Sequence, residues 1–342
     1  MPDNQILLDL FSLTGSPSDD KILYSTIKTV QDLHRTIATL SAQLDEDRIP
    51  ENSMIRIVEK KLDADLREAA RTLDKREARF LVSTYYNLQE NRIRLDSQVR
   101  QCGEPAVFTS WMADIFRSLE DNVRVALDVY SSSHPVGVWA RSKKGVGPVI
   151  AAGLLAHLDI YAPQRDPNTK DFELDENGKK KLSVCEHPGS WMAFCGLAPN
   201  VKWGKGEKRP WNADLKSLVC FKLGESFVKT SGGEKPGYYG KVYKARKALE
   251  IERNESGLFR EIAHERLKAG KIDKSTVMFK SLVEGKLPPA WIHARARRKA
   301  VKLFLSHFHE KLYEHEFGKK PQLPYVITHL GHVDFVSADE TY

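Results

Sequence analysis

The sequence contains little cysteine and no long apolar run. Its 342 residues include four cysteines and no close CxxC pair, so nothing indicates a disulfide framework and a reducing compartment is expected. No window offers about 18 consecutive apolar residues, so no membrane span is expected. The first residues, MPDNQILLDLFSLTG, have neither a basic region nor the apolar length of a signal peptide. We therefore expect a cytoplasmic protein without a membrane partner.

Several catalytic and nucleotide-binding motifs are also missing. The stretch KKGVGPVIAAGLLAHL begins at Lys143 and contains Gly-Val-Gly at 145–147, but a dinucleotide fold needs a third glycine where Ile150 stands. The preceding WARSKK is polar rather than an apolar strand, and no Gly-Lys-Ser/Thr follows, so a P-loop is excluded too. The chain has no GxSxG elbow and no HExxH helix. Hydrolase and nucleotide-cofactor classes are therefore unsupported, and we assign no cofactor.

Charge is distributed unevenly along the chain. Residues 1–100 carry 15 Lys and Arg against 17 Asp and Glu, a net charge of −2, whereas residues 101–342 carry 38 against 29, a net of +9. An acidic front and a basic back suggest that the back meets a polyanion. Apolar residues make up 41% of the sequence and charged residues 29%, so a packed core is expected.

The periodicity of apolar residues predicts a mainly α fold. Residues 1–132 read as a long-helix arm or coiled-coil bundle that could dimerise, and the small residues and proline of 131–137 mark a boundary. Residues 133–320 form a second helical domain, with helices around Trp191 and over about 212–229, 240–254 and 289–316. Asn177-Gly178, between FELDE and KKKLSV, predicts a small inserted β-hairpin. Residues 321–342 read as an extended tail.

The Gly-Val-Gly turn is the first candidate site. Pro148 suits the first position of the following helix, and glycine at 145 and 147 permits positive φ. Backbone N–H groups of such a turn face outward as an anion nest, beside Lys143 and Lys144. This is the pattern of a helix-hairpin-helix element, which holds phosphates without reading bases. The alternative is an ordinary αα-hairpin whose glycines only close the turn.

Two further clusters combine cations with a loop or a helix. Basic groups neutralise phosphates and flat indoles stack on unpaired bases, so alternating Lys/Arg and Trp suit a nucleic-acid channel. A glycine-containing loop supplies Lys202, Trp203, Lys205, Lys208, Arg209 and Trp211. A helix without acids from 287 to 302 supplies Arg295, Arg297, Arg298, Lys299 and Lys302. Solvated lysines and core-anchoring tryptophans are the alternative reading of both.

Metal binding has weak support. Cys185, His187 and Cys195 supply three of the four ligands of a structural zinc, and a fourth at finger-like spacing is lacking. His307, His309 and His315 cluster near glutamates without forming a recognised motif. We therefore assign no metal site and no catalytic residue.

The segments GVGPVIAAGLLAHLDI, WMAFCGLAPNVKWGKG and KRPWNADLKSLV resemble, in this order, the C-terminal domain of a transposase family. These insertion-sequence transposases join a resolvase-like acidic domain to a helix-hairpin-helix serine domain and are guided by a bridge RNA. The resemblance covers residues 139–230 and implies a DNA-binding, recombination-related protein. In the family a Ser-Gly after GLAP supplies an attacking serine; here Trp203-Gly204 stands there, and tryptophan has no nucleophilic oxygen. The family's N-terminal acidic domain has no counterpart in these helices.

These observations predict a transposase-related, nucleoid-associated protein that grips the phosphate backbone of DNA, or of structured RNA. It would form a homo-oligomer through its N-terminal helices. Two alternatives stay open. One is an active DNA recombinase that uses a metal or a different serine, with Ser217, Ser226 and Ser231 as candidates; the other is a protein scaffold.

Overall fold

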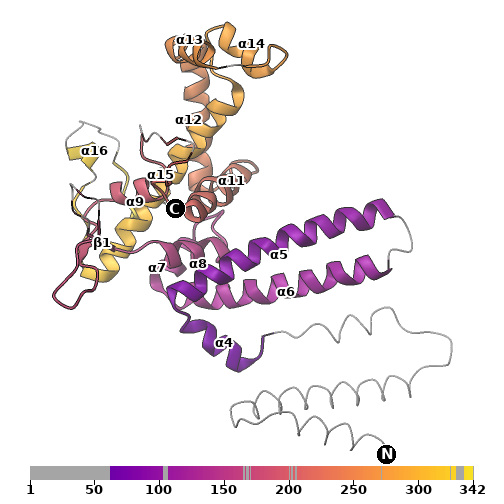
Figure 1. The fold of residues 1–342 in the computed structure, drawn as a ribbon, viewed down its shortest axis with the longest axis vertical. Helices are drawn as coiled ribbons and strands as arrows, with labels where there is room; N and C mark the ends of the chain where they lie inside the picture. The colour runs from indigo at the N-terminus through magenta and orange to yellow at the C-terminus, as the bar shows by residue number, and fades with distance from the viewer. Residues whose placement is uncertain are drawn as a thin grey trace, which may run out of the picture. The chain divides into compact units, whose positions relative to one another are not determined.

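The structure is a computed structural model that describes residues 62–102, 107–164, 166, 169, 171–199, 201, 203–204, 206–270, 272–323, 325–328 and 335–341. It is mainly helical, as the sequence predicts, with a single small sheet in the part described (Figure 1). None of the described helices combines the length and the apolar character needed to cross a membrane. The first part of the predicted arm, residues 1–61, lies outside the described residues.

The chain divides into two compact units. One contains residues 1–61 and 92–118, and the other contains residues 62–91 and 119–342. The predicted boundary near residue 133 lies within the second unit, at a point where a helix ends. Helix α6 (Val107–Ser132) ends and α7 (Pro135–Arg141) begins across a tight corner, since a Cβ on Gly137 would lie 2.0 Å from the Ser131 carbonyl oxygen.

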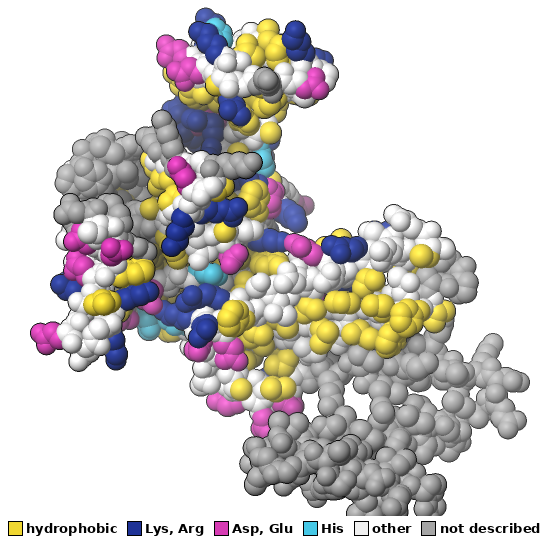
Figure 2. Space-filling model, in the orientation of Figure 1, with side chains coloured by type: hydrophobic (Ala, Val, Ile, Leu, Met, Phe, Trp, Pro, Cys, Tyr) yellow, Lys and Arg dark blue, Asp and Glu magenta, His cyan; other side chains and the backbone are white. Residues whose placement is uncertain are grey.

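In the first unit, the described residues are the end of α5 (Lys75–Cys102) and the start of α6. Arg117 forms ion pairs with Asp96 and Asp114 across and along these helices. The first turns of α6 expose apolar side chains, among them Phe108 at 69% and Trp111 at 44%, whose rings are 5.4 Å apart. Figure 2 shows apolar side chains in a row along α5 and α6.

The second unit has a helical core around α15 (Pro289–Phe317). Pro289 begins this helix and Gly318, with φ of 66°, ends it, as the sequence rules for helix termini predict. Its Phe304 packs against the fully buried Phe227 and Tyr239, with ring centroids 5.5 and 5.1 Å away. Helices α7, α9 (Gly189–Phe194), α11 (Gly224–Lys229) and α12 (Tyr238–Glu255) contact α15, and the unit also contains α4 (Ala64–Arg71) and α8 (Pro148–His157).

The segment from 213 to 229 is continuous but not uniform. Helix α10 (Ala213–Ser217), capped by the Asn212 side chain, leads into a π-helical turn, η1 (Leu218–Leu223), and then into α11. The predicted helices over 212–229, 240–254 and 289–316 are thus confirmed. Between α12 and α15, two helices had no predicted counterpart: α13 (Arg260–Ala269) and α14 (Val277–Val283). Each buries a single residue, Ala263 in α13 and Leu282 in α14.

The predicted β-hairpin is right in its turn and wrong in one strand. Gly178 has φ of 72° and its N–H donates to the Asp175 carbonyl oxygen (3.0 Å). The two-stranded sheet, however, pairs β1 (Tyr161–Pro163) with β2 (Leu182–Val184), whereas FELDE contributes only an isolated bridge at Leu174. The expected strand therefore lies ten residues upstream of its predicted place.

The C-terminal tail is not simply extended. It contains α16 (Tyr325–Thr328) and a 3₁₀ turn, η2 (Ala338–Glu340). Ala338 and Thr341 are 1% and 2% exposed, so the last described residues are docked into the second unit.

Candidate nucleic-acid interface

The Gly-Val-Gly turn joins α7 to α8 as predicted, but its two glycines differ. Gly145 has φ of 102°, which few residues other than glycine adopt, and the Val146 N–H donates to the Lys143 carbonyl oxygen (2.9 Å). Gly147 is the N-cap of α8 with φ of −84°, so the expected positive φ is wrong there. A Cβ on Gly147 would meet nothing within 4 Å.

Gly145 faces the protein. The Ser226 hydroxyl donates to the Gly145 carbonyl oxygen, and a Cβ on Gly145 would lie 3.1 Å from Thr230 Oγ1 and 3.2 Å from Phe227. Val146 is 5% exposed and belongs to the core. The turn is therefore held against α11. Packing against α11 is enough to explain the glycine at position 145, without an anion nest.

The two lysines beside the turn are engaged by backbone carbonyls. Lys143 Nζ donates to the Thr341 oxygen (2.8 Å), and Lys144 Nζ donates to the Lys235 oxygen. Burial, aided by the Lys311 ammonium, lowers the pKa of Lys143, although Asp339 opposes this shift. Lys143, which the sequence places as added charge beside the turn, thus contacts the C-terminal tail in the structure, and its part in phosphate binding stays a prediction.

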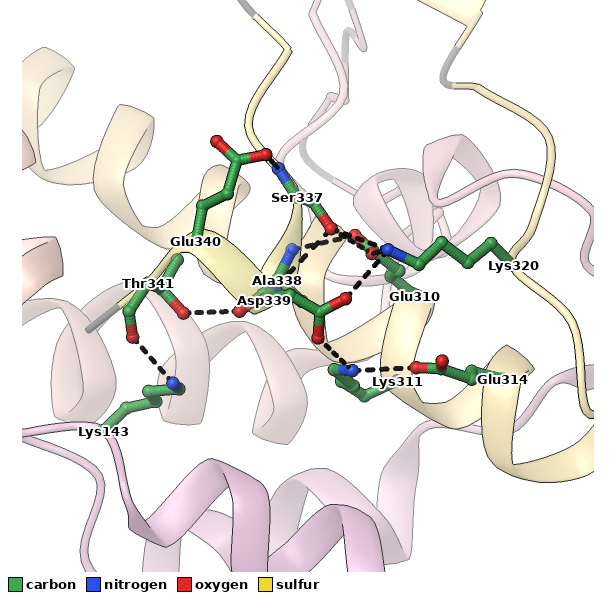
Figure 3. A network of polar contacts seen from close by, with 10 residues as sticks. All are labelled: Lys143, Glu310, Lys311, Glu314, Lys320, Ser337, Ala338, Asp339, Glu340 and Thr341. Atoms are coloured by element: carbon green, nitrogen blue, oxygen red, sulfur yellow. Dashed lines mark hydrogen bonds and ion pairs between the residues drawn. The ribbon is translucent and has the colours of Figure 1, made fainter.

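The tail docks through a polar network around Glu310 (Figure 3). The buried Glu310 carboxylate accepts hydrogen bonds from the Ser337 hydroxyl (2.6 Å) and the Ala338 N–H (3.0 Å). Asp339 accepts from Lys311 (2.6 Å) and Lys320 (2.8 Å), and these two ammonium groups lower the pKa of Asp339 to about 2. Figure 3 places Lys143 at the end of this network.

Comparing the same substitution at the two glycines tests the geometry of the turn. We expect Gly145→Ser to lower the free energy of unfolding by about 1–2 kcal/mol, because the new Cβ is strained at positive φ and crowded by α11. Gly147→Ser should change it by less than about 0.5 kcal/mol, since its site is open and serine is a good N-cap. Urea unfolding measures both, and equal losses would contradict this description.

The loop cluster is exposed and held in place by its own backbone. Trp203 is 41% exposed and its indole N–H donates to the Glu207 carbonyl oxygen (2.7 Å). The Trp211 ring lies 6.1 Å from the Trp203 ring, and the Arg209 guanidinium lies over Trp203 at 5.3 Å. Lys208 is exposed. The predicted residues Lys202 and Lys205 lie outside the described residues.

Four of the five cations predicted on α15 divide into two pairs. Arg295 forms an ion pair with the buried Glu250 (2.6 Å), and Arg297, with only 13% of its side chain exposed, pairs with Glu225. Both therefore have internal carboxylate partners, and their predicted contact with a phosphate backbone stays a prediction. Arg298 and Lys299 are exposed and pair with no carboxylate of the described residues.

The positive charges of Arg298 and Lys299 also act on Lys302, which lies one turn further along α15. Its pKa is lowered first by burial and then by the positive charges of Arg298 and Lys299. Like charges that lower a neighbour's pKa indicate a local excess of positive potential, because a nearby carboxylate would have raised it. A polyanion is the natural counter-charge for such a site.

The structure connects the loop cluster to α15 through α10. Lys216 places its ammonium 3.7 Å above the Trp211 ring. One turn later, Cys220 has its pKa raised by burial, while Lys216, Arg297 and Arg298 all act to lower it, so these groups lie within electrostatic range of one thiol. We call the resulting surface the basic track; its members are Lys208, Arg209, Lys216, Arg298, Lys299 and Lys302. Sequence reasoning missed Lys216, whose only signal was its position five residues after Trp211.

Few of the described residues support a metal site or a nucleophilic serine or cysteine. Among the residues that the structure describes, no three His, Cys, Asp or Glu side chains are grouped as metal ligands. The hydroxyls of Ser226 and Ser231 donate to backbone carbonyl oxygens, whereas Ser217 is exposed on α10. Cys185 and Cys195 are buried thiols whose pKa is raised by burial.

No protein-family model matches this chain, and comparisons with the curated proteins and with the solved structures give no match either. The residues of the basic track therefore carry the functional argument by themselves.

Proposed function

We propose that this protein binds nucleic acid, DNA in the first instance, by laying a phosphate backbone along the basic track. The observation that carries the proposal is the convergence of two cationic segments, 203–211 and the start of α15, through Lys216. Six cations without a carboxylate partner among the described residues provide enough charge for several simultaneous phosphate contacts.

The proposal differs from a helix-hairpin-helix grip. Lys143 and Lys144 are bound to carbonyl oxygens, so they support the hairpin's fold rather than a phosphate. We retain the relation to bridge-RNA-guided transposases as a proposal of descent, resting on the ordered segments between 139 and 230. Trp203 at the serine position favours a binding role over strand transfer, and association with the nucleoid would follow from DNA binding.

Homo-oligomerisation through the N-terminal helices also remains a proposal. Its support is the exposed apolar surface at the start of α6, where Val107, Phe108 and Trp111 are 73%, 69% and 44% exposed. Apolar groups gathered on one helix face often mark a protein contact.

The salt dependence of binding tests the proposed function. If six cations contact phosphates, the affinity for a duplex should fall about 10³-fold between 50 and 200 mM salt. Fluorescence anisotropy with a labelled duplex measures this slope. An affinity that does not change with salt would contradict phosphate binding, and no retardation of DNA or RNA would leave the scaffold alternative. Strand cleavage in the presence of magnesium would instead support the recombinase.

A further inference from the structure

Aromatic rings and cations form pairs along the basic track. Arg209 lies over Trp203 (5.3 Å), Lys216 over Trp211 (3.7 Å), and Arg297 over Phe221 (5.3 Å). The three pairs follow one another from the loop through α10 to η1, which is the same path that the cations take. A surface that binds phosphates alone has no need of aromatic rings beside its cations, so the rings require a separate explanation.

The Trp203 side chain exposes part of its indole ring to solvent. Its indole N–H is already satisfied by the Glu207 carbonyl oxygen, and the Gly204 N–H donates to the Glu207 carboxylate (2.8 Å), which closes the loop beneath it. The polar atom is thus used internally, and what remains exposed, 41% of the residue, is mainly hydrocarbon. A ring held in place before a ligand arrives loses little conformational entropy on binding.

Phe221 is a second exposed ring, at 55%, and lies in the π-helical turn η1. Arg297 beneath it is fixed by Glu225 and by its close packing on Gly224, where an added Cβ would lie 2.8 Å from Arg297 Cδ. The guanidinium therefore serves as a support for the ring rather than as a phosphate ligand. Each ring consequently keeps a fixed position relative to the cations around it.

We infer that the basic track takes unpaired nucleotides, with bases stacked on Trp203 and Phe221 and phosphates held by the cations between them. This inference rests on the proposed function and names its substrate class. In a duplex the bases are stacked on one another and their faces are inaccessible, whereas a single strand offers a base face and a phosphate at every nucleotide. Aromatic stacking contributes about 1–3 kcal/mol per base and tolerates any sequence.

The test compares an oligothymidine strand with a duplex of equal length at one salt concentration. The double variant Trp203→Leu/Phe221→Leu should bind the single strand about 30-fold or more weakly, from two lost stacking contacts. Its affinity for the duplex should change less than about threefold, since no track cation is removed. Trp203→Phe should restore part of the single-strand affinity, because a smaller ring still stacks.

Phe335→Leu is the matched control, because Phe335 is 42% exposed but lies in the C-terminal tail, outside the basic track. It should leave both affinities unchanged. Equal losses for single strand and duplex in the Trp203→Leu/Phe221→Leu variant would overturn base stacking while leaving phosphate binding intact. If the wild-type protein binds neither probe, the proposed function fails, and the stacking inference fails with it.

Discussion

Replacing Arg298, Lys299 and Lys302 together with glutamine is expected to weaken DNA binding about 100-fold at moderate salt. These three side chains form the part of the basic track on α15, where Lys302 carries a lowered pKa in the field of the other two. Losing about 1 kcal/mol for each phosphate contact gives a total of about 3 kcal/mol, and each 1.4 kcal/mol is about tenfold in affinity.

The slope of affinity against salt should change in the same variant. Each lost phosphate contact removes about 0.9 from the slope of log K against log salt for a duplex, so three lost contacts flatten it by about 2.7. The fold should be little affected, because Arg298 and Lys299 are exposed and form no ion pair with the described residues. Anisotropy titrations at several salt concentrations provide both numbers.

A control with the same change in charge is available on the second unit. Lys268, Lys274 and Lys280 are exposed on and around α13 and α14, outside the track. Their replacement by glutamine lowers the net charge equally but should weaken binding less than about threefold. Similar losses in the two variants would mean that total charge, not the track, governs binding.

Glu310→Ala is expected to lower the free energy of unfolding by about 2–4 kcal/mol and to release the C-terminal tail. Glu310 is 5% exposed and accepts hydrogen bonds from the Ser337 hydroxyl and the Ala338 N–H (Figure 3). Removing the carboxylate leaves these two donors buried without an acceptor, at about 1–3 kcal/mol each. Urea unfolding measures the loss of stability. Faster hydrogen exchange at the amides of 337–341 would report the undocking.

The control for this change is on the same helix. Glu314→Ala removes a carboxylate that is 37% exposed and contacts only Lys311 in the tail network. An exposed ion pair contributes about 1 kcal/mol or less, so this variant should stay close to the wild type in both measurements. If Glu310→Ala behaves like Glu314→Ala, the tail is not held by the buried carboxylate.

The helices of the second unit could be predicted because their signals are local. Asn212 caps α10, Pro289 begins α15 and Gly318 ends it, and each acts on backbone groups within one turn. The position of the β-turn was readable for the same reason, from Asn177-Gly178. The pairing of β1 with β2 was not, since three-residue strands that include Pro163 show no alternating pattern.

The functional site was harder to predict because charge does not show its partner in the sequence. Arg295 and Arg298 look alike in the run of cations, but a buried carboxylate 45 residues away, Glu250, takes Arg295. Lys143 is likewise taken by a backbone oxygen of Thr341, 198 residues further on. Only the fold distinguishes a cation that holds the protein together from one that is free to meet a ligand.

The π-helical turn η1 lies between α10 and α11 and sets the angle by which their side chains are rotated relative to each other. A wider turn of this kind follows when one residue is added to an α-helix, and each residue in an α-helix advances by about 100°. Without the extra residue, α11 would rotate away from the Gly145 carbonyl that Ser226 holds, while Lys216 would keep its place over Trp211. With the π-helical turn, the segment 213–229 contacts the Gly145 turn through Ser226 at one end and places Lys216 over Trp211 at the other.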